Sequence, residues 1–384
     1  MKNIQKLQQC SNCGACYNIC PTDAIELKED SLFYEWTVNA DKCIDCGKCV
    51  AVCPIENPIS AQNVCSAYGV IHNDDQVVKK SSSGGAFSAI AEMILEQGGI
   101  VYGAVFLEDW RAIEIRSTDS HTLDEIRRSK YVESKVGLTF REVKSVLEAS
   151  PHKPVLYCAA PCQIAGLKHY LGKDYANLIT CDFSCGGVPS HGIYQAYLSM
   201  IEKRLGGEIA DVNFRPKIYG WLNHAMKIVA VNGKKYCKPI MADPYYTCFV
   251  GANHHVSVRE YCLFCDFANN HYADIILADF WKYKTISNLN NDNKGISLVI
   301  TNSQKGEKII DAISKKVALT HLGLDTATYN LTEKNTSQEC IDRRAKFLNE
   351  IEQDGITSAL KNVKVKSPIK FKVRYWIRKF MGRN

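Results

Sequence analysis

The spacing of apolar residues is regular between residues 64 and 205. Short apolar runs of strand length alternate there with segments whose apolar residues recur at helical spacing. The runs predict strands at 64–71, 100–106, 112–116, 155–159 and 178–183. The segments with helical spacing predict helices at 86–97, near 123–129, at 138–149 and at 164–171, and a last helix that follows residues 185–190 and ends at 205. Strands that alternate with helices are typical of α/β architecture.

From Gly207 onward the pattern changes to strands. Apolar runs predict strands at 209–214, 225–231 and 234–239, and Asn232-Gly233 marks a hairpin turn between the last two. A buried strand within 273–281 and another at 295–301 follow. The last 50 or so residues have the pattern of a polar helix followed by a basic tail.

The first 63 residues contain little apolar periodicity. A short hairpin is expected between 21 and 42, with strands at 24–27 and 33–38, and the turn-rich stretch 54–63 is a plausible linker. We therefore expect four units, at 1–60, 61–153, 154–340 and 341–384.

Composition is ordinary except for cysteine. The chain has 384 residues, of which 46% are hydrophobic, 23% are charged and 18 are cysteines. No apolar segment precedes the first cysteine, and no window reaches the roughly 18 apolar residues of a spanning helix. Free thiols on this scale favour a reducing cytoplasm.

Eight cysteines near the N-terminus repeat one spacing. Each run reads C-x-x-C-x-x-C-x-x-x-C-P, the pattern of bacterial ferredoxins with two [4Fe-4S] clusters. The longer spacer and the proline turn the fourth thiolate toward the other cluster. The expected ligand sets are Cys10, Cys13, Cys16 and Cys53 for one cluster, and Cys43, Cys46, Cys49 and Cys20 for the other. Zinc sites show separated pairs, and disulfide frameworks belong to small secreted chains, so both alternatives fit less well.

Four later cysteines form a second set. They stand at predicted strand ends or in loops, where they could converge: Cys162, Cys185, Cys262 and Cys265. The C-x-x-C formed by the last two fits zinc, a redox dithiol or an Fe-S site, and beside two clusters a third is the most economical interpretation. The remaining cysteines are expected to be small buried hydrophobic residues: Cys65, Cys158, Cys181, Cys237, Cys248 and Cys340.

A Ser-Gly-Gly segment opens the helix predicted at 86–97. Ser83, Gly84 and Gly85 could simply cap this helix. Small residues at a helix N-terminus also expose backbone N–H groups to a phosphate or a flavin edge. No G-x-G-x-x-G follows a strand, so a Rossmann nicotinamide site is not supported.

Six motifs in order carry a family resemblance. They are S-S-G-G-A-F-S-A-I, S-K-Y-V-E-S, A-A-P-C-Q-I-A-G-L, C-G-G-V-P-S, C-L-F-C-D-F and A-D-I-I-L-A-D-F-W. Over roughly residues 1–340 the chain resembles the beta subunit family of coenzyme F420 hydrogenases and dehydrogenases, in the bacterial form with an N-terminal dicluster ferredoxin. The expected fold is thus an α+β ferredoxin-like dicluster domain followed by an α/β flavin-binding domain.

The resemblance implies cofactors and a reaction. It implies FAD beside a third [4Fe-4S] cluster on the second cysteine set, with hydride transfer to or from a small organic substrate. Relatives use coenzyme F420 or reduce a chlorophyll, and bacterial members often accompany surface-polysaccharide genes. A flavin next to clusters converts single electrons into a hydride. The alternatives are an electron-transfer subunit serving a partner enzyme and, third, an Fe-S sensor or scaffold.

Site residues follow from the same motifs. The flavin is expected against Ser83, Gly84, Gly85, Ser129, Lys130 and Tyr131. Lys130 could balance a phosphate or reduced flavin, or be a solvated surface lysine. His191 could donate a proton, although a helix-capping surface histidine is the simpler interpretation. Ala278 and Lys282 replace glycines of the usual G-D-F-W-G, which puts the substrate in doubt more than the cofactor.

Charge separates the tail from the body. The net charge is +6, but residues 361–384 hold nine Lys or Arg and no acid, which leaves −3 for the rest. Aromatic and aliphatic residues interleave with these cations, as in segments that lie on anionic membranes, and docking on the acidic body or on a partner is the alternative. Expected partners are reduced ferredoxin or another electron donor and a small-molecule substrate, without nucleic acid. The expected location is the cytoplasm or the inner face of the membrane as a peripheral protein. Assembly into a homo-oligomer is a further possibility.

Overall fold

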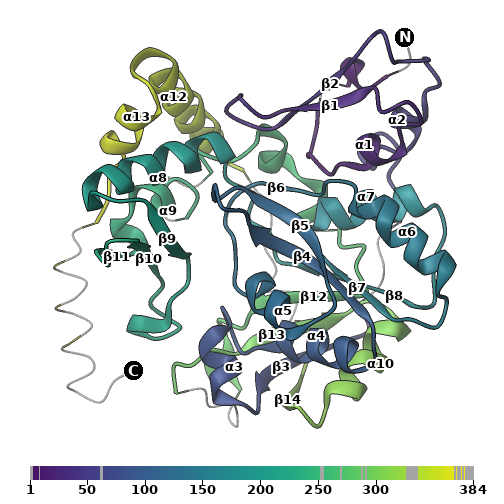
Figure 1. Cartoon of the computed structure of the whole chain (residues 1–384). Helices are drawn as coiled ribbons and strands as arrows, with labels where there is room; N and C mark the ends of the chain where they lie inside the picture. Colours follow the sequence, from purple (N-terminus) through teal and green to yellow (C-terminus); the bar gives the residue numbers. More distant parts are fainter. Residues whose placement is uncertain are drawn as a thin grey trace.

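A nine-stranded mixed sheet forms the centre of the molecule (Figure 1). The computed structural model describes residues 3–7, 9–60, 64–250, 255–268, 270–286, 289, 292–325, 336–366, 369, 373 and 376. In spatial order the strands are β14 (Val317–Leu322), β3 (Ser66–His72), β13 (Ser297–Thr301), β12 (Ile275–Asp279), β8 (Leu178–Phe183), β7 (Val155–Cys158), β4 (Ile100–Phe106), β5 (Ala112–Ser117) and β6 (Ser134–Lys135). Strands from 61–153 and from 154–340 therefore share one sheet.

The four central strands, β12, β8, β7 and β4, are parallel to one another. Both of their faces are buried, which explains their nearly continuous apolar sequences. On one face, Tyr102 and Tyr157 pack with α6 (Thr139–Ala149) and α7 (Pro161–Leu171). On the other, Val101 and Leu156 pack with α4 (Ala86–Glu96), α5 (Ser120–Ile126) and α10 (Gln304–Ile313).

Helix α5 begins three residues before its expected position. The Asp119 carboxylate accepts a hydrogen bond from the Thr122 backbone N–H at 2.9 Å and caps the helix there. Because the helix ends at Ile126, residues 129–131 lie in the following loop rather than at its end. The short helix α3 (Asp75–Lys80) was not expected, since its six residues are too few to show a helical period.

A smaller antiparallel sheet packs beside the large one. Its order is β11 (Lys235–Pro239), β10 (Ala225–Ala230) and β9 (Ile209–Asn213), and Asn232-Gly233 turns between the first two as predicted. Helices α8 (His191–Leu205), α9 (Pro244–Thr247), α12 (Gln338–Asp354) and α13 (Ile356–Asn362) share its aromatic-rich core. Figure 1 shows this group of elements on the side of the molecule away from α6.

The N-terminal region folds as a separate small unit over α6 and α7 (Figure 1). It contains η1 (Ile4–Lys6), α1 (Ala15–Ile19), the predicted hairpin of β1 (Ile25–Lys28) and β2 (Glu35–Val38), and α2 (Lys48–Ala51). The Arg141 guanidinium of α6 donates to the backbone oxygens of Asn18 at 2.7 Å and Cys20 at 2.9 Å. Side-chain hydrogen bonds of this kind hold the small unit against the body.

Most of the basic tail predicted over 361–384 lies outside the described residues. Within the part that is described, no helix is both long and apolar enough to cross a membrane.

Candidate functional site

Two turns of the N-terminal unit repeat the same backbone geometry around their cysteines. Asn12 and Gly14 have φ of 61° and 77°, and their counterparts Asp45 and Gly47 have φ of 53° and 72°. Left-handed conformations favour Gly, Asn and Asp, so the sequences S-N-C-G and I-D-C-G suit these turns. The two turns contain Cys13 and Cys46, the second cysteine of each run.

The last cysteine of the first run lies with three cysteines of the second run. One small cavity is lined by Cys20, Cys43, Cys46 and Cys49. The thiols of the other set are close enough to interact electrostatically: Cys10, Cys13, Cys16 and Cys53. In the described residues no group of three or more His, Cys, Asp or Glu is placed around a single metal ion. The donor set, four thiols each, fits [4Fe-4S] cubes.

The structure also brings the second cysteine set together. Cys162 is the second residue of α7, Cys185 follows β8, and Cys262 and Cys265 lie in and directly after η4 (Glu260–Phe264). The Cys162 thiol interacts electrostatically with all three others. All four line one large cavity of about 790 Å³ at the carboxyl ends of the parallel strands.

The first and second cysteine sets are neighbours. A Cβ built on Gly166 of α7 would lie 3.0 Å from the Cys13 sulfur, so only glycine allows this close approach. The Cys162 sulfur lies 3.8 Å from the Ser11 backbone oxygen, and Ser11 and Asn12 line the large cavity. A group held by the Cys10–Cys53 set would therefore stand next to one held by the second set.

Of the remaining cysteines, Cys181, Cys248 and Cys340 are buried, as expected. Cys65, which directly precedes β3, is exposed, and Cys158 and Cys237 are only partly buried, so the expectation is wrong for these three. Cys158 lines the cavity, and its register partner on β8 is Cys181.

Five of the six residues expected at the flavin line the same cavity. They are Ser83, Gly85, Ser129, Lys130 and Tyr131. The Ser129 N–H and hydroxyl meet the Ser82 hydroxyl at 2.9 and 3.1 Å, which joins the loop after α5 to the Ser-Gly-Gly segment. Two motifs far apart in sequence therefore form one wall.

Gly84 does not line the cavity. A Cβ at this position would lie 2.2 Å from the Val70 backbone oxygen and 2.6 Å from the Ser297 nitrogen. The Gly84 N–H donates to the Ser297 hydroxyl at 3.0 Å. Gly84 thus permits the chain entering α4 to pack on β3 and β13, while Gly85 beside it lines the cavity.

Lys130 is not a solvated surface lysine. Its ammonium donates to the backbone oxygens of Glu125, Ile126 and Arg127 at 2.7, 2.9 and 3.0 Å, at the C-terminus of α5. Burial lowers its pKa to about 7, and the nearby Arg128 acts in the same direction. The helix carbonyls hold this cation at the cavity wall.

A largely buried ion pair beside Tyr131 also lines the cavity, and sequence reasoning missed it. The Arg215 guanidinium pairs with the Asp279 carboxylate, which also accepts from the Trp221 indole N–H at 2.9 Å. Burial would raise the pKa of Asp279, but the charge and hydrogen bonds of Arg215 outweigh it and hold that pKa below its ordinary value. Asp279 belongs to the A-D-F-W motif, whereas nothing in N-F-R-P distinguishes Arg215 from a surface arginine.

Aromatic rings surround this pair. Trp281, which lines the cavity and is 45% exposed, stacks on Trp221 with ring centroids 4.8 Å apart. The Arg215 guanidinium lies 5.8 Å from the Trp281 ring centroid. Burial and Arg215 together lower the pKa of His224 to about 3, so its imidazole is neutral. Of the two departures from G-D-F-W-G, Ala278 lines the cavity and Lys282 does not.

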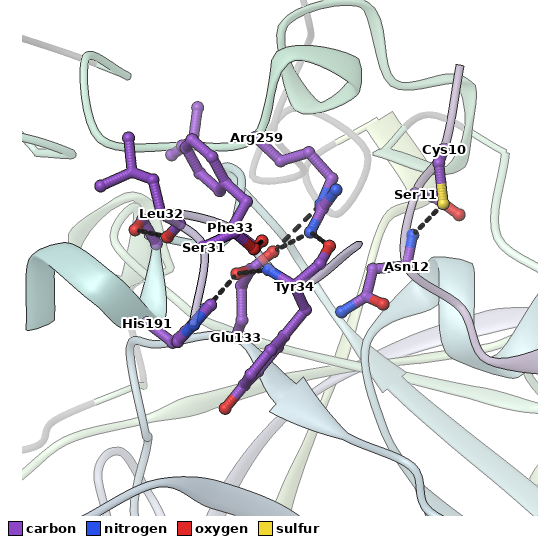
Figure 2. A network of polar contacts seen from close by, with 12 residues as sticks. Cys10, Ser11, Asn12, Ser31, Leu32, Phe33, Tyr34, Glu133, His191 and Arg259 are labelled. Atoms are coloured by element: carbon purple, nitrogen blue, oxygen red, sulfur yellow. Dashed lines mark hydrogen bonds and ion pairs between the residues drawn. The ribbon is translucent and has the colours of Figure 1, made fainter. Parts of the chain in front are cut away.

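His191 joins the N-terminal unit to the body (Figure 2). Its ring is 4% exposed and stacks on Tyr34 with centroids 3.7 Å apart. One ring nitrogen meets the Glu133 carboxylate at 3.2 Å and the other meets the Glu29 backbone oxygen at 3.0 Å. The expectation of a surface histidine is therefore wrong, because the hairpin loop covers it.

Arg259 occupies the centre of the same network, between the hairpin loop and the segment carrying Cys10 (Figure 2). It donates to the Glu133 carboxylate at 2.6 and 3.0 Å and to the Tyr34 backbone oxygen at 2.6 Å. It also interacts electrostatically with the thiols of Cys10 and Cys262. This largely buried cation thus stands between the first and second cysteine sets.

Comparison with known proteins agrees with the sequence motifs. Two models of the coenzyme F420 hydrogenase/dehydrogenase beta subunit match the chain, the N-terminal one over residues 67–138 and the C-terminal one over 152–325. Residues 9–57 match the model of a 4Fe-4S dicluster domain. No curated protein matches the chain. Among solved structures, a chain of the F420-reducing [NiFe] hydrogenase complex from Methanosarcina barkeri matches with 16% identity and a TM-score of 0.45, over 82% of this chain and 99% of that chain.

Proposed function

The chain belongs to the coenzyme F420 hydrogenase/dehydrogenase beta subunit family, and on that premise we propose that it is an iron-sulfur flavoprotein oxidoreductase. It passes electrons between [4Fe-4S] clusters and FAD, and it reduces or oxidises a small organic substrate by hydride transfer. The match to a 4Fe-4S dicluster domain and to an oxidoreductase family supports this proposal.

One observation carries the proposal. The second cysteine set and five of the residues expected at the flavin line a single cavity of about 790 Å³. This volume lies within the range of about 300–1,000 Å³ that is usual for cofactor and ligand sites. A third cluster on Cys162, Cys185, Cys262 and Cys265 would thus share a cavity with the flavin.

The residues present suit FAD. The Ser-Gly-Gly segment brings backbone and hydroxyl groups to the N-terminus of α4, where a phosphate is stabilised by the helix dipole. Lys130, from the loop joined to that segment, adds a cation to the cavity lining. When bound, a flavin exchanges one electron at a time with clusters and two with a substrate.

The part of the cavity lined by the Arg215–Asp279 pair is our candidate substrate position. Arg215 Nε, buried here, has no hydrogen-bond partner among the described residues, so a ligand oxygen could accept from it. The exposed face of Trp281 offers a stacking surface to a planar or apolar group. These features favour a small molecule with both an acceptor oxygen and a flat face.

Anaerobic purification tests the cofactor content directly. We expect about one FAD and, for three four-iron cubes, about 12 iron and 12 sulfide per chain. Cys262→Ser should lose about a third of the iron and keep the ferredoxin signals, because Cys262 lies outside the two N-terminal sets.

Cys65→Ser is the matched control, since the exposed Cys65 lies outside the cavity. Equal iron content in Cys262→Ser and wild type would show that Cys262 is not a cluster ligand. Absence of flavin from the wild-type protein would contradict the proposal that it is a flavoprotein. Turnover of substrate by the isolated chain separates an enzyme from a subunit that serves a partner.

A further inference from the structure

Glu114 is a buried carboxyl group in the wall of the large cavity. It lies on β5, is 3% exposed and lines the cavity beside Lys130 and Ser134. Its Oε1 accepts a hydrogen bond from the Ser134 hydroxyl at 3.0 Å. Among the described residues, its Oε2 has no hydrogen-bond partner. A buried, unpartnered carboxyl oxygen beside a cavity indicates an interaction with whatever the cavity holds.

A hydrogen-bond network connects this carboxyl group to the second cysteine set. The Gln163 side-chain amide donates to both the backbone oxygen and the hydroxyl of Ser134 at 3.2 Å. Its carbonyl oxygen accepts from the Ala160 N–H at 3.1 Å. Because Gln163 directly follows Cys162 in α7, this network links the position of Glu114 to one of the predicted ligands of the third cluster.

The titratable groups that face Glu114 come from two other elements. Lys130 belongs to the loop after α5, and Tyr157 belongs to β7. Cys158, at the end of β7, faces Lys130. Lys130 cannot form a close pair elsewhere, because its ammonium is held by the carbonyls at the end of α5. A negative charge on Glu114 would therefore find one fixed cation nearby.

Burial gives this pair protonation states that change near neutral pH. It raises the pKa of Glu114 to about 8, against the smaller opposing effects of Ser134 and Lys130. The same burial lowers the pKa of Lys130 to about 7. Pairs of groups whose environments move their pKa values toward the working pH are typical of acid–base sites.

We propose that Glu114 is the proton donor and acceptor of the cavity. The inference rests on the proposed function, since it assigns the proton that accompanies electron arrival at a flavin. Two electrons from the clusters and one proton from the Glu114 carboxyl group together make up the hydride equivalent. Glu114 is left as a carboxylate near the Lys130 ammonium and regains a proton from water before the next cycle. No further oxidant or reductant is required.

Glu114→Gln tests this role, because Gln keeps the shape and the Ser134 hydrogen bond but carries no transferable proton. In holoprotein with confirmed FAD content, we expect flavin reduction at pH 7 to slow by about 10- to 100-fold. In wild type the rate should fall as pH rises through about 8, because the donor must be protonated. The variant should lose this dependence.

Glu352→Gln is the matched control, since the Glu352 side chain on α12 is exposed and lies outside the cavity. A second measurement needs no variant: the infrared difference between reduced and oxidised wild type should contain a protonated-carboxyl band, which Glu114→Gln removes. An unchanged rate, pH profile and infrared spectrum in a flavin-loaded Glu114→Gln protein would overturn the inference. Absence of flavin in wild type would instead overturn the proposed function.

Discussion

At the scale of single residues, burial acts in opposite directions on Glu114 and Lys130. It raises the pKa of the carboxyl group to about 8 and lowers that of the ammonium to about 7. Each group therefore binds protons differently in the folded and unfolded states, and stability depends on pH.

The sign for Glu114 follows from its raised pKa. Between its ordinary value of 4.5 and about 8, the folded state holds a proton that the unfolded state has released, so stability falls as pH rises through this window. Lys130 has the opposite effect: its lowered pKa makes stability rise with pH between about pH 7 and 10.5. Glu114→Gln, which cannot ionise, should gain roughly 1–4 kcal/mol relative to wild type between pH 5 and 8.

Melting temperatures of both proteins across this range, under anaerobic conditions, measure the gain. The Glu352→Gln variant, exposed on α12, should follow wild type at every pH. A stability difference between Glu114→Gln and wild type that stays constant from pH 5 to 8 would mean that Glu114 is ionised in the folded protein.

Residue types revealed part of the site. Cysteine spacing predicted both N-terminal sets, since ligand geometry there is local, and the four later cysteines were found because each stands at a strand end or in a loop. Glu114 and Arg215 were not found. Their importance comes from burial by distant elements: Arg215, for example, pairs with Asp279 of β12, 64 residues further along the chain. No local pattern records such contacts.

At the scale of elements, α6 holds the N-terminal unit through one side chain. The Arg141 guanidinium donates to the backbone oxygens of Tyr17, Asn18 and Cys20 and to the Asp23 carboxylate at 2.8 Å. The backbone acceptors lie at the C-terminal end of α1, whose final carbonyls lack partners within the helix. Arg141 therefore stabilises both the end of α1 and its docking.

Arg141→Ala should destabilise the protein by about 1–3 kcal/mol, since it leaves several oxygens without donors. Hydrogen exchange should accelerate selectively over residues 15–23. Arg343→Ala on α12 is the control, because Arg343 forms an i,i+4 pair with the exposed Glu339 and should change stability by less than about 0.5 kcal/mol. Uniform exchange rates in Arg141→Ala and wild type would show that the docking does not depend on this contact.

Periodicity predicted most central strands and long helices because each buries a full face. It gave no signal for η4 or for the two-residue strand β6 (Ser134–Lys135), which are too short to repeat a pattern. These short pieces position Cys262 and Ser134. The elements that complete the site are thus the ones least visible in the sequence.

At the scale of the whole molecule, three cysteine sets and one cavity lie in succession. The Cys20–Cys49 set surrounds its own small cavity, the Cys10–Cys53 set adjoins α7, and the second set opens into the large cavity. This order suits a relay in which single electrons enter at the ferredoxin domain and leave as a hydride beside the Arg215–Asp279 pair. The order could not be predicted from sequence, because it depends on how the N-terminal unit docks.

The relay is the central claim, and Cys185→Ala tests it most directly. Flavin reduction by reduced ferredoxin should be measured in anaerobic protein shown by iron analysis to lack the third cluster, with Cys237→Ala on β11 as the control. We predict that Cys185→Ala keeps its FAD and accepts electrons from a small chemical reductant, whereas reduced ferredoxin no longer bleaches the flavin at a useful rate. Normal bleaching by ferredoxin in that protein would contradict the relay.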